Sequence, residues 1–183
     1  MTTQNADRPT PDDALAELYS RCMAGAPGDE QWSLPRARAF LAMWLQRQPD
    51  LFLVAEVDGR VVGGNVCDLK PYFDGPRFTD SEMFVEPAVR HLGVARALWQ
   101  RQLSESGPRY GVVGIELLAN GHSPVALDWF TRLGFQRTEW VHMEAPLAVL
   151  RARLGLAPEP DRQQVDLDAD ADSVRPPRPR SGG

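Results

Sequence analysis

The sequence predicts an α/β fold in which helices flank both faces of a mixed sheet. Three observations lead to this prediction. Two amphipathic helical patterns open the chain, short apolar strand patterns then alternate with helices, and a tight glycine turn joins one strand to a helix. The predicted order is α-α-β-β-β-α-β-α-β, contained in one domain over residues 10–150. Residues 1–9 are expected to be a flexible leader, and residues 151–183 a helix end followed by a disordered tail rich in Pro, Asp and Arg.

The first half of the chain carries two helices and a hairpin. Thr10-Pro11, followed by two acids, is typical of a helix start, and Asp58-Gly59 is typical of a hairpin turn. Pro9 and Pro11 oppose a strand at the N-terminus, so the sheet is expected either to lack an edge strand there or to have that edge covered by a partner. The elements predicted here are a helix over 10–24, a helix from 33–35 to about 48, and strands over 51–57 and 60–69.

The second half alternates strands with helices. Gly107-Pro108 ends one helix, and Gly134 stops the next. The predicted elements are a strand over 78–85, a helix over 89–106, a strand over 112–119, a helix from about 124 to 133, and a last long strand over 135–147.

Composition narrows the classes of function. The net charge of −5 argues against a nucleic-acid-binding surface, and no run approaches the roughly 20 apolar residues of a membrane-spanning helix. Cys22 and Cys67 read as buried free thiols, which together with the polar N-terminus suggests a cytoplasmic protein. Two cysteines and three histidines without close spacing predict no metal site. The preponderance of arginine over lysine suggests a bacterial source.

The turn after the strand at 78–85 has the chemistry of an anion site. Pro87 ends the strand, and the segment Arg90–Ala95 leads through Gly93 into an apolar helix. Free backbone N–H groups converge at such a helix start, and the helix dipole adds positive potential. The sequence therefore predicts that this turn holds a phosphate group.

Two segments together resemble a known family. Arg90-His91-Leu92-Gly93-Val94-Ala95 resembles the Arg/Gln-x-x-Gly-x-Gly/Ala motif of the Gcn5-related N-acetyltransferase (GNAT) superfamily. Residues 123–135, with Ala126 and Gly134-Phe135, resemble its second motif. The resemblance covers about residues 10–147. It implies a mixed, mostly antiparallel sheet that splays apart where coenzyme A (CoA) binds.

The resemblance also implies acetyl-CoA as cofactor. Its pyrophosphate would lie on the glycine turn, its pantetheine arm would pair with the strand before the turn, and a polar side chain near the second motif would contact it. The residues so implied are Arg90, His91, Leu92, Gly93, Val94 and Ala95 for the pyrophosphate, Met83, Phe84 and Val85 for pantetheine, and Asn120 or Ser123 near the second motif.

One position departs from the family. The tyrosine that commonly protonates the leaving thiolate is replaced by Phe130, which has no proton to donate. Water could serve instead, as could another group such as Tyr72 or Tyr110, or the thiolate could leave unaided. Phe130 also keeps open a CoA-binding regulatory or scaffold module without transferase activity.

Carboxylates on the central strands are the candidates for a general base, because an attacking amine must lose a proton. Alternation places Asp80, Glu82 and Phe84 on one face of their strand, and Glu82 resembles the family's common glutamate base. Glu116 is the second candidate, while Asp80 and Trp32 are expected to contact the acceptor.

The leading hypothesis is acetyl transfer to the amine of a small molecule by direct attack in a ternary complex. The protein would act as a monomer or homodimer. Another acyl donor, or a peptide N-terminus as acceptor, remains an alternative.

Overall fold

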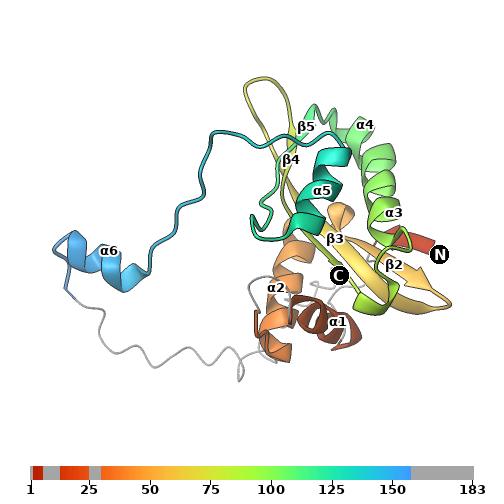
Figure 1. Ribbon diagram of the computed structural model, residues 1–183, viewed down its shortest axis with the longest axis horizontal. Coiled ribbons are helices and arrows are strands. Elements are labelled where there is room, and N and C mark those ends of the chain that lie inside the picture. The colour runs from red at the N-terminus through yellow and green to blue at the C-terminus, as the bar shows by residue number, and fades with distance from the viewer. Residues whose placement is uncertain (1, 6–12, 25–29, 158–183) are drawn as a thin grey trace, which may run out of the picture.

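A five-stranded sheet with helices on both faces forms the body of the protein (Figure 1). The computed structural model describes residues 2–5, 13–24 and 30–157. The strands lie in the order β1-β2-β3-β4-β5, and every neighbouring pair is antiparallel except β4 with β5, which is parallel. Their bounds are Thr2–Asn5 (β1), Leu53–Val57 (β2), Arg60–Lys70 (β3), Arg77–Val85 (β4) and Gly114–Ile115 (β5). The predicted mixed, mostly antiparallel sheet is confirmed.

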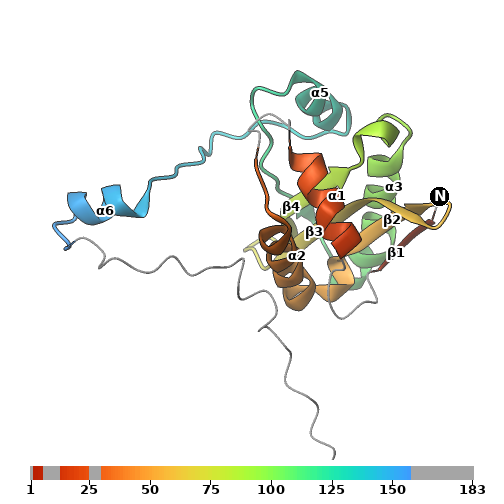
Figure 2. The same ribbon diagram turned by 90° about the horizontal axis from the view of Figure 1, so that it is seen from below.

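Helices α1 and α2 cover one face of the sheet, and α3 covers the other (Figure 2). The α-helices begin and end as follows: α1 Asp13–Met23, α2 Leu34–Arg47, α3 Val94–Arg101, α4 Gly107–Tyr110, α5 Pro124–Arg132 and α6 Leu147–Arg153. Single turns of 3-10 helix occupy Pro49–Leu51 and Pro87–Val89, and a π-helical stretch over Gln102–Ser106 extends α3.

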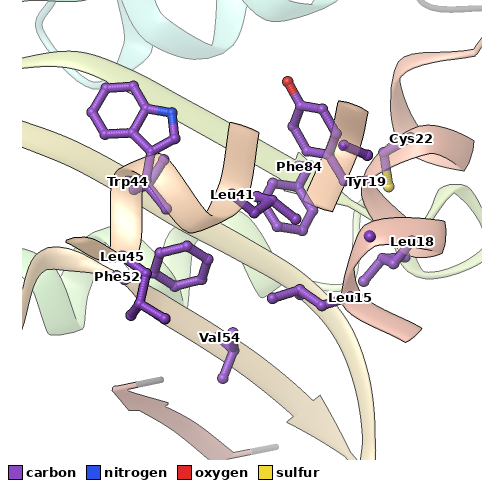
Figure 3. Packing of buried hydrophobic residues seen from close by; sticks show 13 residues of the cluster. Leu15, Leu18, Tyr19, Cys22, Leu41, Trp44, Leu45, Phe52, Val54 and Phe84 are labelled. Carbon is purple, nitrogen blue, oxygen red and sulfur yellow. The ribbon is translucent and has the colours of Figure 1, made fainter. Parts of the chain in front are cut away.

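The main hydrophobic core lies between the sheet and the pair α1–α2 (Figure 3). Phe84 of β4 packs edge-on against Tyr19 of α1, with ring centroids 5.2 Å apart. Gly64 of β3 makes room for this ring, because a Cβ there would lie 2.5 Å from the Phe84 Cζ atom. The core therefore holds the second half of β4 firmly beneath α1.

The N-terminal edge corrects one expectation. Residues 2–5, which we expected in a flexible leader, pair antiparallel with β2, with Thr2 opposite Glu56 and Asn5 opposite Leu53. An edge strand is held by backbone hydrogen bonds on one side only, so it does not require apolar alternation. The prolines at positions 9 and 11 lie outside the described residues.

The C-terminal half departs further from prediction. The expected strand over 112–119 pairs only at Gly114–Ile115, and the expected last strand over 135–147 is absent. Residues 135–146 instead run as an extended chain away from the body, and α6 follows them (Figure 1). Alternation of side chains favours an extended backbone, but a strand also needs a neighbouring backbone to pair with. The predicted tail beyond residue 157 lies outside the described residues.

Candidate active site

The sheet opens between β4 and β5. The two strands pair only through Arg77 with Gly114 and Phe78 with Ile115. One further backbone bond, from the Glu116 N–H to the Phe78 carbonyl at 2.8 Å, ends their contact. Beyond Phe78, the outer edge of β4 has no strand beside it within the described part of the chain. This is the splay that the sequence resemblance implied.

A β-bulge shapes β4 where the splay begins. Asp80 and Ser81 together lie opposite the single residue Cys67 of β3, because the register shifts by one residue there. Asp80 takes a left-handed backbone conformation with φ of 51°, and its carboxylate pairs with Lys70. The bulge thus interrupts the strict alternation we predicted for β4 immediately before Glu82.

Beyond the bulge the predicted faces are observed. Glu82 and Phe84 lie on the side of α1 and α2, where Phe84 joins the core. On the α3 side, the Ser81 hydroxyl donates to Asn65 Oδ1 at 3.0 Å, and Val85 packs against the small cluster under α3. Glu82 therefore lies near Tyr19 of α1 and near Glu30, in the chain that leads into α2.

Glu82 has an unusual electrostatic environment. Burial is the main cause, and the like charges of Glu30 and Asp80 add to it, so that the pKa of Glu82 rises from an ordinary 4.5 to about 7. A carboxyl group with this pKa is close to half protonated at neutral pH. It can both accept and release a proton there, which is the property required of a general base.

Glu116, the second predicted base, has a different setting. It follows β5 directly, and its Oε2 accepts a hydrogen bond from the Tyr72 hydroxyl at 2.8 Å. Arg77 lies 3.7 Å from its other carboxylate oxygen. Two partners thus hold the Glu116 carboxylate at the base of the splay, whereas the neighbours of Glu82 repel its charge.

Neither candidate tyrosine has a free hydroxyl. The Tyr72 hydroxyl is engaged by Glu116, and this hydrogen bond raises the pKa of Tyr72. Tyr110, the last residue of α4, donates its hydroxyl hydrogen to Asp50. Phe130, in α5, contacts the rings of Trp129 and Phe135 at 5.0 and 5.4 Å between centroids. Among the described residues, none of these groups is placed as an evident proton donor to a leaving thiolate.

The turn before α3 has the geometry of an anion cradle. Gly93 has φ of 86°, and a Cβ there would meet nothing within 4 Å, so the backbone conformation rather than space favours glycine. Within the described part of the chain, no backbone carbonyl accepts from the N–H groups of Gly93–Arg96. These donors and the helix dipole fit a pyrophosphate.

Arg90, expected to bind the pyrophosphate, hydrogen-bonds to two backbone carbonyls of the protein itself. Its Nε donates to the Val85 carbonyl at 3.1 Å, and its Nη2 donates to the Cys22 carbonyl at 3.3 Å. The guanidinium thus ties the turn to the end of β4 and to α1. It still contributes positive charge beside the turn.

Asn120 and Ser123, the two polar residues predicted to contact the cofactor, lie in one hydrogen-bonded turn before α5. Asn120 Oδ1 accepts from the His122 N–H at 2.8 Å, and the Asn120 carbonyl accepts from the Ser123 N–H at 3.0 Å. Ser123 occupies the N-cap position of α5, but its hydroxyl makes no capping hydrogen bond. Both residues therefore lie at the N-terminus of α5.

Trp32 lies on the same side of the sheet as Glu82. Its ring packs edge-on against Tyr19 at 5.3 Å, and its Nε1 donates to Glu30 Oε2 at 2.6 Å. Glu30 was not predicted, because it stands in a segment without periodicity. Its influence on the Glu82 pKa depends on packing between segments about 50 residues apart.

A buried pair of amide side chains, Asn65 of β3 and Gln102 after α3, was also not predicted. Asn65 donates through Nδ2 to Gln102 Oε1 at 3.5 Å, and both side chains are almost fully buried. Only Asn65 could have been noticed in the sequence, because it is an amide within an otherwise apolar strand. No group of three or more His, Cys, Asp or Glu within the described ranges could hold a metal ion, and no helix there is long and apolar enough to cross a bilayer.

Comparison with known proteins agrees with this geometry. Residues 48–137 match the acetyltransferase (GNAT) domain. The chain is 33% identical over 125 residues to an acetyltransferase of Sodalis glossinidius, covering 68% of this chain and 80% of that protein. It is 28% identical over 149 residues to an N-acetyltransferase of Methanocaldococcus jannaschii, covering 78% of this chain but only 65% of the relative.

Solved structures give the same result for the fold. A chain of the NatC complex bound to Gag peptide and CoA superposes with a TM-score of 0.58 at 18% identity, covering 75% of this chain and 86% of that one. The splayed sheet, the glycine turn and the sequence relatives together lead to one conclusion. The chain carries a GNAT-type acyltransferase domain and belongs to the GNAT superfamily of acetyltransferases.

Proposed function

We propose that this protein transfers an acetyl group from acetyl-CoA to the amine of a small molecule, by direct attack while both substrates are bound. The observation that carries this proposal is Glu82, a carboxyl group with a pKa of about 7 just beyond the bulge of β4. A base tuned to neutral pH beside a splayed sheet edge has no evident structural purpose, since burying it costs stability.

The described residues fit acetyl-CoA, which supplies the acetyl group as a reactive thioester when bound. The N–H groups of Gly93–Arg96 would hold the pyrophosphate, with the positive end of α3 behind them. The outer edge of β4 over Met83–Val85, which pairs with no strand among the described residues, would take the amides of pantetheine as an added strand does; the Val85 carbonyl there already accepts from Arg90. The side chain of Asn120 or Ser123 would contact the same ligand near α5.

Glu82 would take the proton of the acceptor. A small aliphatic amine is mostly an ammonium ion at neutral pH, so a base must remove a proton before nitrogen can attack a carbonyl carbon. The negative charges of Glu30 and Glu82 would attract such a cation, whereas the charge of Asp80 is balanced by Lys70. Trp32, which is half-buried and donates to Glu30, would contact the acceptor beside them. Once the ammonium approaches, its positive charge favours the ionised form of Glu82, which then accepts the proton.

Cellular context belongs to the same proposal. Cys22 and Cys67 are free and buried, which supports a reducing compartment such as the cytoplasm. The net charge of −5 supports a cationic small molecule rather than a nucleic acid as partner. The composition supports a bacterial source.

The decisive experiment compares the wild type with Glu82→Gln. Acetyl-CoA binding is measured by calorimetry, and CoA release is measured with a panel of mono- and diamines. We expect Glu82→Gln to bind acetyl-CoA normally but to lose about 10²–10⁴-fold in kcat/KM, together with the pH dependence near 7. Glu105→Gln changes an exposed carboxylate of the π-helical stretch after α3, which pairs with Arg101; it is the matched control and should retain full activity.

Two results would contradict the proposal. Absence of acetyl-CoA binding to the wild type would remove the cofactor assignment. Full activity of Glu82→Gln with an unchanged pH profile would remove Glu82 as the base while leaving the cofactor assignment intact.

Phe130 favours a second candidate, a CoA-binding module without turnover. The ring of Phe130 packs between Trp129 and Phe135 where the family commonly has a tyrosine. Binding of acetyl-CoA with no CoA release for any acceptor would support this candidate. The Phe130→Tyr variant discriminates further, because a gain in kcat would indicate that protonation of the leaving thiolate limits the wild type.

A further inference from the structure

Glu30 and Glu82 have a different setting from several other carboxylates around the sheet. Those carboxylates are paired with an arginine or a lysine: Asp50 with Arg109, Asp68 with Arg47, Asp80 with Lys70, Glu86 with Arg21, and Glu116 with Arg77. Within the described part of the chain, no arginine or lysine pairs with Glu30 or Glu82, and the charge of Glu30 adds to the rise in the Glu82 pKa. The acceptor side of the candidate active site therefore carries an excess of negative charge.

Aromatic packing brings these two carboxylates near one side chain, Tyr19. The Nε1 of Trp32 donates to Glu30 Oε2 at 2.6 Å, and the Trp32 ring packs edge-on against Tyr19 with centroids 5.3 Å apart. The Tyr19 ring also packs edge-on against Phe84 at 5.2 Å, and Phe84 follows Glu82 by two residues on the same face of β4. Tyr19 thus adjoins both carboxylates, one through Trp32 and the other through Phe84.

The hydroxyl group of Tyr19 is unused in the described part of the chain. It makes no hydrogen bond there, although Tyr19 is only 2% exposed, and it points away from the labelled core side chains (Figure 3). Burial first, and then the charges of Glu82 and Glu30, raise the pKa of Tyr19, so the hydroxyl stays protonated close to both carboxylates. Buried polar groups normally have a partner. An unpaired hydroxyl beside two carboxylates therefore points to a ligand that donates hydrogen bonds.

The reacting amine can balance only one of the two charges. Its nitrogen must release a proton before it attacks, and that proton moves to a carboxylate oxygen of Glu82. An ammonium–carboxylate pair thereby becomes an amine and a carboxyl group, and neither carries a charge. Glu30 takes no part in this transfer. A cation that balances Glu30 must therefore be a second group of the acceptor, one that does not react.

We propose that Tyr19 and Glu30 form a subsite for this second, non-reacting cationic group, so that the acceptor is a diamine or an amine that also carries a guanidinium group. This inference rests on the proposed acetyl transfer and names its substrate class. An ammonium ion has three N–H donors, of which one would bond to Glu30 and another to the Tyr19 oxygen. Trp32 occupies Oε2 of Glu30 and leaves the other carboxylate oxygen for the ligand.

The subsite also predicts the product. Transfer to one end of a diamine converts that end into a neutral amide, while the far end keeps its positive charge at Glu30. A second transfer would have to place the amide at Glu30 and the remaining amine at Glu82, which leaves Glu30 without a cation. The enzyme should therefore acetylate a diamine once.

The first test is calorimetric titration of the full chain, with and without CoA. The ligands are unbranched diamines from ethylenediamine to cadaverine and the n-alkylamines of the same carbon number. We expect the best diamine to bind about 10-fold more tightly than its matched monoamine, because it gains charge-assisted hydrogen bonds. Glu30→Gln should remove this difference and leave the affinity for the monoamine unchanged.

Two further variants sharpen the titration. Tyr19→Phe keeps the aromatic packing and removes only the hydroxyl, so it should weaken diamine binding by about 3-fold and leave monoamine binding unchanged. Glu17→Gln is the matched control, because it makes the same change of charge on the exposed face of α1. It should keep the wild-type preference for diamines.

The second test follows CoA release and the mass of the product. Glu30→Gln should raise KM for the diamine about 10-fold with kcat nearly unchanged, whereas general damage to the fold would lower activity toward both classes of amine. Mass spectrometry should show the singly acetylated diamine.

The proposal is overturned if wild type binds diamines and monoamines equally, if it binds neither, if Glu30→Gln weakens both alike, or if both ends of a diamine are acetylated at comparable rates. Its failure is distinguishable from that of the proposed function. Acetyl transfer to both classes alike, unaffected by Glu30→Gln, would remove this subsite and leave the transferase. Binding of diamines that depends on Glu30 but gives no CoA release would support the subsite and remove the transferase activity.

Discussion

Replacing Glu82 by glutamine removes a half-buried ionisable group while keeping nearly the same side-chain shape. In the folded protein, burial first and then the charges of Glu30 and Asp80 raise the pKa of Glu82 to about 7, against 4.5 for the same group in water. Unfolding returns the carboxyl group to water. The stability of the wild type must therefore depend on pH in a way that the stability of Glu82→Gln does not.

The sign follows from which state binds the proton more tightly. The folded state does, so the stability contributed by protonated Glu82 is fully present below pH 4.5 and is lost as the pH rises through 7. Each unit of pKa corresponds to about 1.4 kcal/mol. The raised pKa of Glu82 should therefore cost about 3 kcal/mol of stability at pH 8, where the folded protein holds it ionised, and about 1 kcal/mol at pH 5, where folding takes up a proton.

The assay is urea unfolding followed by tryptophan fluorescence at pH 5 and pH 8. We expect Glu82→Gln to exceed the wild type in unfolding free energy by about 3 kcal/mol at pH 8, and by about 2 kcal/mol less at pH 5. Glu17→Gln, on the exposed face of α1, is the control and should change stability by less than about 0.5 kcal/mol at either pH. A difference between Glu82→Gln and wild type that is the same at both pH values would refute the reasoning.

Two further predictions concern the core. Gly64→Ala should destabilise the fold by about 1–3 kcal/mol in the same unfolding assay, because its Cβ would lie 2.5 Å from Phe84 and 3.2 Å from the Leu53 carbonyl; unchanged stability would show that the Phe84 ring can move aside. Burial raises the pKa of Cys22 to about 11 and that of Cys67 to about 12, so neither thiol should react with Ellman's reagent at pH 8 until urea unfolds the protein; reaction of two thiols per native chain would contradict their burial.

Local patterns in the sequence were sufficient for the elements whose form depends on near neighbours. Leu15, Leu18, Tyr19 and Cys22 follow the i, i+3, i+4, i+7 spacing of one helix face, and all four are in the core beneath α1. The Asp58-Gly59 turn joins β2 to β3, and both residues have positive φ as that turn requires. In such cases the spacing of apolar residues, or the backbone freedom of one residue, specifies the structure directly.

Elements that depend on a distant partner were predicted less well. β1 forms because β2 offers its backbone, although its own sequence favours no strand. The segment 136–146 has the alternation of a strand but pairs with no other strand in the described part of the chain. The bulge at Asp80 was invisible in the sequence, because a register shift is a property of two strands rather than of one.

The same division holds at the candidate active site. The order of strand, glycine turn and helix is legible in the residues around Gly93, and with the second motif it was enough to identify the superfamily and to select Glu82. What suits Glu82 to act as a base is its surroundings, namely partial burial beside α1 and the nearness of Glu30. Likewise Arg90 bonds to the Cys22 carbonyl, 68 residues away. Periodicity and turn chemistry act over a few residues and can be read along a chain, whereas desolvation and charge coupling arise only when folding brings remote segments together.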